Sequence, residues 1–170
     1  MAKGLSPARQ DIDLTGPLQS TGHLLRRGVQ RYAALWTATV TAGLTSPQFA
    51  LLALLAREGE LDQRTIAEGA ALDKSTCGDL VDRLASRGLV DAAIDPGNRR
   101  RKLVRITDAG REQLAAAAPQ QREVHAAALA ELSETERAEL NRLLRKLLGL
   151  EAWPASSVGG RTTAGPNGRR

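Results

Sequence analysis

Apolar residues recur at helical spacing near the start of the chain. They are Leu18, Leu25, Val29, Tyr32, Trp36 and Val40, separated by steps of seven, four, three, four and four. Residues at this spacing lie on one face of a helix. The pattern predicts a helix over residues 17–42 whose apolar face needs a partner surface along its whole length.

A denser apolar run follows this stripe. Ser46-Pro47 places a capping residue before a proline at the first helical position, and the segment FALLALLA then continues to about Glu58. Almost every side of this second predicted helix is apolar. We therefore expect it at the centre of the core.

Two short helices are predicted next, over residues 62–69 and 73–87. Asp62 and Asp73 each stand where a carboxylate can cap the free amide groups at a helix start. Only the link GAAL, residues 69–72, separates the two helices. This layout is typical of a helix-turn-helix.

The pattern then changes from helix to strand. Leu89-Val90 begins one extended segment, and RKLVRIT, residues 101–107, forms another. The turn residues Pro96-Gly97-Asn98 lie between the two segments. Together they predict a β-hairpin.

Two further helices complete the pattern. Thr107 can cap a helix over residues 108–129, in which Pro119 predicts a kink or a restart because proline removes a helical hydrogen bond. Ser133-Glu134-Thr135-Glu136 is a capping box, and it opens a helix over residues 133–149 with a leucine-rich face.

The composition agrees with a helical fold. The chain has 170 residues, of which 42% are hydrophobic but only 2% aromatic, so the core must consist mainly of alanine and leucine, which favour helices. We predict one mainly α domain of the α+β class over residues 16–150. The flanking residues 1–15 and 151–170 are polar or rich in Gly, Ser, Thr and Arg, and we expect mobile tails there.

Several functions are excluded by what the sequence lacks. One cysteine and two histidines are too few for a disulfide framework or a zinc site within one chain, so we expect no metal and no cofactor. No glycine-rich phosphate loop or nucleophile–base pair has a recognisable spacing, and we expect no enzyme. No apolar run reaches membrane-spanning length and no signal-peptide core begins the chain, which predicts a cytoplasmic protein without a membrane partner.

The positive charge gathers on the predicted hairpin. Of a net charge of +5, residues 95–107 carry +4, while the chain outside this segment and the tails is close to neutral. A basic hairpin after a helix-turn-helix indicates a winged helix, whose wing can contact DNA phosphates or place a guanidinium in the minor groove. The alternative is a solvated basic turn with no ligand.

Three segments resemble the MarR family of bacterial transcription regulators: LDKST (72–76), LVDRLASRGLV (80–90) and DPGNRRRKLVRITDAG (95–110). The resemblance covers about residues 17–150. It implies a winged helix-turn-helix DNA-binding lobe over about residues 46–107, with a two-stranded β-wing. It also implies a helical dimerisation region, in which the first, fifth and sixth predicted helices form a homodimer.

By this resemblance, the helix over 73–87 enters the major groove of double-stranded DNA, and a homodimer would bind a pseudo-palindromic operator. Lys74, Ser75 and Thr76 at its exposed N-terminal end would contact phosphates and base edges, helped by the helix dipole. The remaining candidate DNA contacts are Arg64, Arg83, Asn98, Arg99 and Arg100.

Two positions depart from the family pattern. Gly78-Asp79 replaces a Thr-Arg pair, and Asp79 could accept a hydrogen bond from cytosine or orient Arg83, of which we favour the second. Asn98 stands where the family has an aspartate that holds the inserted wing arginine, here Arg100. Asn98 can still accept a hydrogen bond, and Asp95 could supply the missing charge.

Cys77 has a structural interpretation. It occupies the apolar position of a hydrophobic staple, five residues after Leu72. Burial there would raise the pKa of the thiol and lower its reactivity. Relatives that sense peroxide carry their cysteine in the first helix, and the first predicted helix of this chain contains none.

The resemblance also implies a small aromatic carboxylate or phenolic effector, bound between the dimerisation helices and the DNA-binding lobe. Trp36 could stack on its ring, and Phe49 is a second ring to test. His23, Arg26 or Arg27 could pair with a carboxylate. The alternative has Trp36 packing in the dimer interface and the charged side chains exposed to solvent.

We therefore predict a dimeric, sequence-specific transcriptional repressor that is released from DNA by a small aromatic acid. The competing hypothesis is a ligand-independent architectural DNA-binding protein. Such a protein would bind many sequences with similar affinity and a steep salt dependence.

Overall fold

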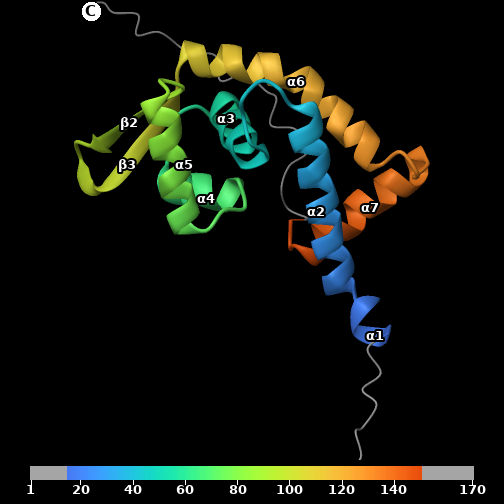
Figure 1. Cartoon of the computed structure of the whole chain (residues 1–170). Coiled ribbons are helices and arrows are strands. Elements are labelled where there is room, and N and C mark those ends of the chain that lie inside the picture. The colour runs from blue at the N-terminus through green and yellow to red at the C-terminus, as the bar shows by residue number, and fades with distance from the viewer. Residues whose placement is uncertain (1–14, 151–170) are drawn as a thin grey trace, which may run out of the picture. The chain divides into compact units, whose positions relative to one another are not determined.

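The structure, a computed structural model, describes residues 15–150, so the predicted tails fall outside the described residues apart from Thr15. The chain divides into two compact units, one ending at Ala128 and the other beginning at Leu129. The first unit contains α1 (Thr15–Leu18), α2 (Thr21–Thr39), α3 (Ser46–Glu58), β1 (Leu61–Asp62), α4 (Gln63–Gly69), α5 (Lys74–Ser86), β2 (Val90–Asp95), β3 (Asn98–Ile106) and α6 (Asp108–Ala128) (Figure 1). The second contains α7 (Glu134–Leu147).

The predicted central helix is confirmed as α3. Leu51, Leu52 and Leu55 have no exposed surface, and they belong to a core that also includes side chains from α4, α5, β2, β3 and α6. The cap of α3 is Thr45 rather than the predicted Ser46. The Thr45 side chain accepts a hydrogen bond from the backbone N–H of Gln48, whose own side chain bonds back to the Thr45 N–H.

The predicted helix-turn-helix is formed by α4 and α5. Asp62 caps α4 and Asp73 caps α5, both as expected from the sequence. The turn between the helices contains Ala71 at a φ of 53°, a left-handed conformation that non-glycine residues seldom adopt.

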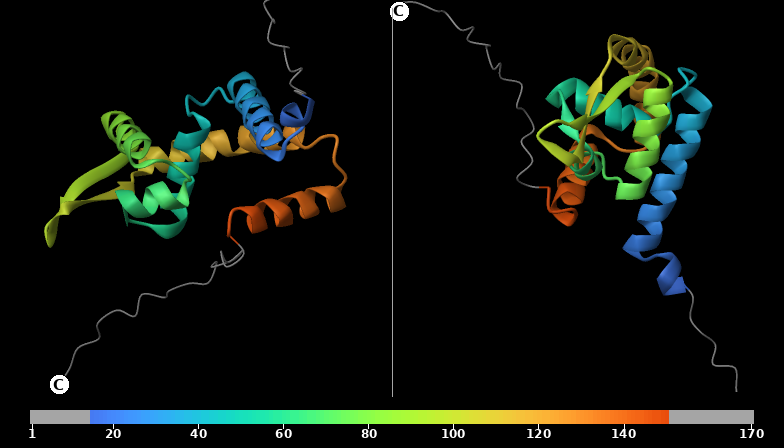
Figure 2. Two further views of the ribbon diagram at one scale, coloured as in Figure 1. Left: turned by 90° about the horizontal axis from the view of Figure 1, so that it is seen from below. Right: turned by 90° about the vertical axis from the view of Figure 1, so that its left-hand side faces the viewer.

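The predicted β-hairpin is confirmed as β2 and β3, and we call it the wing. Its strands pair from Val90 opposite Ile106 to Asp95 opposite Asn98, and the wing extends beyond the helices of its unit (Figure 2). The sequence did not indicate β1, two residues that pair with the other edge of β3, with Leu61 opposite Val104. Strand β1 connects the base of the wing to the start of α4.

The helix predicted over residues 17–42 is two helices. Ser20 separates α1 from α2, because its side chain accepts a hydrogen bond from the backbone N–H of His23 and so begins a new helix. Helix α2 ends at Thr39, and its last turn closes with the Val40 N–H bonded to the Trp36 carbonyl.

Helix α6 runs through Pro119 without a restart. Ala117 and Val124, on either side of the proline, are fully buried, so tertiary packing offsets the missing hydrogen bond. None of the helices between residues 15 and 150 is long and apolar enough to cross a membrane.

The second unit is built around α7. Ser133 and Glu136 form the predicted capping box, and the Arg137 guanidinium donates to the carbonyls of Leu129 and Leu132. Leu143, Leu147 and Leu148 are 48%, 59% and 65% exposed. Among residues 15–150, much of the leucine face predicted for this helix is therefore exposed.

Helix α6 begins in close contact with the end of α5. The Thr107 hydroxyl donates to the Gly88 carbonyl at 2.7 Å and accepts from the Gly110 N–H at 3.1 Å. A Cβ atom at Gly110 would overlap with the Leu89 carbonyl and lie 2.8 Å from Ile106 Cγ1. Glycine is required here because backbone and side chain already fill the space.

Gly110→Ala should therefore destabilise the protein by about 1–3 kcal/mol through overpacking. Gly78→Ala is the matched control, because nothing lies within 4 Å of a Cβ there and alanine favours the helix interior by about 0.5–1 kcal/mol. Urea denaturation followed by circular dichroism measures both changes. Equal stability of the two variants would contradict the close contact at Gly110.

Candidate functional site

Helix α5 begins on a strongly bonded cap. The Asp73 carboxylate accepts hydrogen bonds from the hydroxyl and from the backbone N–H of Thr76, the latter at 2.9 Å. Both hydrogen bonds hold the pKa of Asp73 below its usual value, and the bond from the Thr76 hydroxyl is the larger cause. Of the three predicted contacts at this helix end, Lys74 and Ser75 are exposed and open to a ligand, whereas the Thr76 hydroxyl proton already serves the cap.

The side of α5 that faces away from the core is exposed and polar. The buried side of the helix consists of Cys77, Leu80, Val81 and Leu84. Asp79 and Arg83 are both exposed, and no ion pair joins them within residues 15–150. The structure thus does not show Asp79 orienting Arg83, and each side chain can meet a ligand separately.

Arg101, Lys102 and Arg105 of the wing pair with carboxylates of the same chain. Arg101 contacts Asp62 at 3.1 Å and Asp95 at 3.4 Å. The other two pairs are Lys102 with Asp82 at 2.6 Å and Arg105 with Asp91 at 2.9 Å. Arg101 and Lys102 thus join β3 to the cap of α4 and to the exposed side of α5, while Arg105 and Asp91 join the two strands of the wing.

Asp62 takes part in both the α4 cap and the wing. Its carboxylate accepts from the backbone N–H groups of Arg64 and Thr65 and pairs with Arg101. The hydrogen bond from the Thr65 backbone is the main cause that lowers the pKa of Asp62, and Arg101 lowers it further. The carboxylate therefore stays ionised where the wing meets the helix.

The tip of the wing remains basic. Arg99 is exposed, and no ion pair engages it in the part of the chain that the structure describes. Arg100 lies in β3 next to it. Asp95, which the sequence suggests as a partner for Arg100, pairs with Arg101 and accepts from the Gly97 N–H.

Two other sequence candidates have intramolecular partners. The exposed Arg64 pairs with Glu68 one turn along α4 at 3.0 Å, and this bond raises the pKa of the guanidinium. Cys77 is 1% exposed and its Sγ lies 3.4 Å from the Gln63 carbonyl. Burial is the main cause that raises the pKa of the thiol, in agreement with a packing role.

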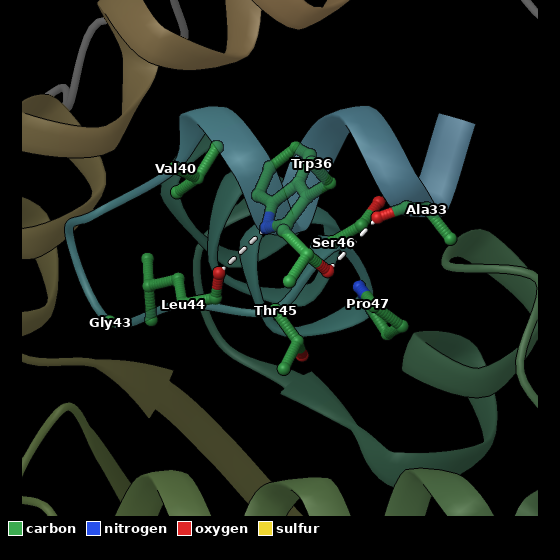
Figure 3. Close-up of a pocket in the computed structure, with 9 residues that line it drawn as sticks. Ala33, Trp36, Val40, Gly43, Leu44, Thr45, Ser46 and Pro47 are labelled. Carbon is green, nitrogen blue, oxygen red and sulfur yellow. Dashed lines mark hydrogen bonds between the residues drawn. The ribbon is translucent and has the colours of Figure 1, made fainter. Parts of the chain in front are cut away.

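A pocket of about 380 Å³ opens between the end of α2 and the start of α3 (Figure 3). It is lined by Ala33, Trp36, Thr37, Val40, Gly43, Leu44, Thr45, Ser46 and Pro47. The Trp36 indole N–H donates to the Leu44 carbonyl at 2.7 Å, which fixes the ring in the pocket wall. The lining combines one aromatic ring with aliphatic groups and three hydroxyls, and it contains no charged side chain.

The structure brings together two of the five predicted effector residues. Trp36 lines the pocket, and the Phe49 ring packs edge-on against it with centroids 5.5 Å apart. His23, Arg26 and Arg27 lie in the first half of α2, outside the pocket lining.

The loop that forms one wall of this pocket contains none of the predicted effector residues. Gly43 adopts a φ of 70° there, and Thr45 and Ser46 contribute hydroxyls. A glycine followed by two hydroxyl residues between two helices was the available signal, but only the fold places these residues opposite Trp36.

The fold and the arrangement of charge define a winged helix-turn-helix protein. Helix α5 exposes a polar side away from the core, and the wing beside it carries unpaired positive charge at its tip.

The chain belongs to the MarR family, whose family model matches residues 42–101. The transcriptional repressor NicR of Pseudomonas putida is 33% identical over 87% of this chain and 96% of its own length. The transcriptional regulator PcaV of Streptomyces coelicolor, solved with its natural ligand, superposes with a TM-score of 0.73 at 37% identity, covering 79% of this chain and 95% of that one. BpsR of Bordetella bronchiseptica, whose DNA binding is regulated by 6-hydroxynicotinic acid, gives 0.71 at 32% identity, with 75% and 97% covered. The predicted family and winged-helix fold are thus confirmed.

The cap of α5 predicts a measurable pH dependence. A carboxylate whose pKa is lower in the folded state stabilises the protein above its unfolded pKa of about 3.9. That stabilisation is lost as the pH falls through the folded pKa. Asp73→Asn should keep the cap, because asparagine caps as well as aspartate, but should lose this part of the acid sensitivity.

Urea midpoints at pH 7 and pH 3 test this expectation. The wild type should lose more stability between the two pH values than Asp73→Asn, while Asp62 and the other bonded carboxylates remain in both proteins as an internal reference. An identical loss in the two proteins would exclude Asp73 as a source of the pH dependence.

Proposed function

We propose that this protein is a homodimeric transcriptional repressor that binds a pseudo-palindromic DNA operator and is released by a small aromatic acid. The observation that carries the proposal is the exposed polar side of α5 beside a wing whose tip holds Arg99 and Arg100. An α-helix fits the major groove of DNA, and a basic hairpin can reach the flanking phosphates or the minor groove.

The ion pairs of the wing support a division of roles among its basic residues. Arg101, Lys102 and Arg105 have carboxylate partners in the protein, so they position the wing. Arg99 is exposed without an ion pair among residues 15–150, which leaves its charge available to phosphate. Arg100 follows from the family resemblance as the arginine that enters the minor groove, with Asn98 beside it.

On α5, the groups proposed to meet DNA are Lys74 and Ser75 at the N-terminal end and Arg83 farther along. The helix dipole adds partial positive charge near Lys74. The Thr76 hydroxyl donates its proton to the Asp73 cap, and its oxygen can still accept a hydrogen bond from DNA. Arg64 can exchange Glu68 for a phosphate, because an exposed ion pair of this kind contributes little to stability.

Uncovered apolar side chains support the homodimer. In the first unit, Leu25 and Val29, one turn apart on α2, are 41% and 69% exposed, and Leu18 of α1 is 59% exposed. In the second unit, Leu143 and Leu147 of α7 are 48% and 59% exposed. Two copies joined by these faces would present two α5 helices to successive major grooves, about one helical turn apart.

The pocket beside Trp36 supports the aromatic effector. Its volume of about 380 Å³ suits a ligand built on a single ring. Trp36 would stack on the ring, and the hydroxyls of Thr37, Thr45 and Ser46 can bond to polar substituents. The carboxylate partners that the sequence indicated, His23, Arg26 and Arg27, lie outside the lining of this pocket and stay predictions.

The effector must favour one conformation to release DNA. A ligand that binds two conformations equally well does not shift their equilibrium. We propose that an occupied pocket favours a spacing of the two α5 helices that no longer matches the operator.

Arg100→Ala should weaken operator binding by about tenfold or more while leaving the dimer intact, and Arg99→Ala should weaken it by a smaller factor. Arg105→Ala is the matched control, because it removes the same charge from the same strand but from a residue paired with Asp91. Mobility shifts at fixed salt on an operator selected in vitro measure the affinities, and light scattering measures the mass.

Equal binding by all three variants would remove the wing tip from the mechanism. The selection also separates the two kinds of DNA-binding protein. Enrichment of one inverted repeat supports the repressor, whereas enrichment of no particular sequence supports the architectural protein.

Ala33→Leu should fill the mouth of the pocket and weaken binding of an aromatic acid by about tenfold, because the exposed Ala33 side chain lines it without belonging to the core. Ala34→Leu adds the same side chain to the same helix outside the lining, and should bind like the wild type. Calorimetry with a panel of hydroxylated benzoic and nicotinic acids, including 6-hydroxynicotinic acid, measures the effect. Unchanged affinity in Ala33→Leu for an acid that binds the wild type would place the effector elsewhere.

A further inference from the structure

The loop that connects α2 to α3 is held at four successive residues by side chains from three different helical elements. The four residues are Thr41–Leu44. The binding side chains are Trp36 of α2, Arg87 at the end of α5, and Gln113 and Gln120 of α6.

Helix α6 holds the first half of this loop. The Gln120 side-chain oxygen accepts from the backbone N–H groups of Thr41 at 3.1 Å and Ala42 at 3.3 Å, and its amide donates to the Thr41 hydroxyl at 2.8 Å. The Gln113 amide donates to the Ala42 carbonyl. The two glutamines are seven residues apart, so they lie on one face of α6.

The second half of the loop is held from α5 and α2. Arg87, the residue that ends α5, donates from Nη1 to the Gly43 carbonyl at 3.0 Å. The next carbonyl, of Leu44, accepts the buried hydrogen bond from Trp36 at 2.7 Å. The left-handed φ of 70° at Gly43 lets the chain turn between these two acceptors.

The same two residues form part of the pocket wall. Gly43 and Leu44 line the pocket together with Trp36, and Figure 3 shows the Leu44 carbonyl meeting the indole nitrogen there. A ligand that displaces this wall must therefore also move the Gly43 carbonyl that Arg87 binds. No carboxylate within residues 15–150 pairs with Arg87, so this hydrogen bond is not in competition with an ion pair.

We propose that Arg87 couples the pocket to the DNA-reading helix through the Gly43 carbonyl. Arg87 is a positioning residue: its side chain lines neither the pocket nor the proposed DNA-contacting surface, and its hydrogen bond to the Gly43 carbonyl joins the end of α5 to the pocket wall. The proposal rests on the function proposed above and adds to it the route by which one site senses the other. Because coupling between two binding sites is reciprocal, DNA bound at α5 must also perturb the pocket.

This reciprocity allows a test without knowledge of the effector. Trp36 and Trp153 are the tryptophans of the chain. In a Trp153→Phe background, all tryptophan emission comes from Trp36 in the pocket wall. The probe is the operator fragment selected in vitro with the wild-type protein, and the readouts are the emission maximum and acrylamide quenching of Trp36 during a DNA titration.

The emission and quenching of Trp36 should change as operator DNA saturates the protein. Arg87→Ala should abolish this change while its operator affinity stays within about threefold of the control. The control is Arg111→Ala, which removes the same charge from an exposed arginine of α6 that holds no part of the loop. Circular dichroism checks folding, and Arg87→Gln provides a second variant that retains a polar side chain.

Any aromatic acid that binds the wild type extends the test. Its binding affinity should be unchanged in Arg87→Ala, but its ability to release the operator should fall toward that of a ligand without effect on DNA binding. A variant that merely destabilised the fold would lose ligand affinity and operator affinity together.

The outcomes separate this inference from the proposed function. An unchanged Trp36 signal in the DNA-bound wild type, or an equal response in Arg87→Ala and Arg111→Ala, would overturn the role of Arg87 while the protein remained a DNA-binding regulator. Selection that enriches no DNA at all would overturn the proposed function itself, and the coupling with it.

Discussion

The contact between the start of α6 and the chain leaving α5 is the constraint on which the first unit depends. Thr107 bonds to Gly88 and Leu89 on one side and caps α6 on the other, and Gly110 allows the two backbones to approach. Helix α5, the two wing strands and α6 all begin or end within this contact. A displacement of α5 must therefore be accommodated by the wing and α6 as well.

Ion pairs divide the basic residues of the wing into two groups, those paired with carboxylates of the protein and those at the tip. The carboxylates Asp62 and Asp82 pair with Arg101 and Lys102 of β3, and Asp91 pairs with Arg105 within the wing, while the tip of the wing projects beyond the helices of its unit (Figure 2). Exposed ion pairs of this kind contribute little to stability individually. Their consequence is geometric, because the pairs of Asp62 and Asp82 orient β3 relative to α4 and α5.

Local signals in the sequence predicted the helix-turn-helix, the hairpin and most of the helix starts. Asp62, Asp73, Thr107 and Ser133 cap helices as expected, because a cap depends only on residues within one turn. The bounds predicted for the first helix were wrong, because Ser20 ends α1 and caps α2. In the sequence, Ser20 cannot be told from any other serine in a polar stretch. Strand β1 was not predicted, because two residues are too few to show the alternation of apolar and polar positions typical of a strand. These residues pair only with β3, which is distant in the sequence.

The sequence by itself determined the fold class, the family and the basic character of the wing, because periodicity, caps and composition act over short distances along the chain. Only the tertiary structure decided which charges remain available and which residues share the pocket. Arg101 and Asp62 are 39 residues apart, and Gln120 reaches a loop that lies 79 residues before it at Thr41. Partners so distant in sequence are fixed only when burial of the aliphatic core brings the elements together.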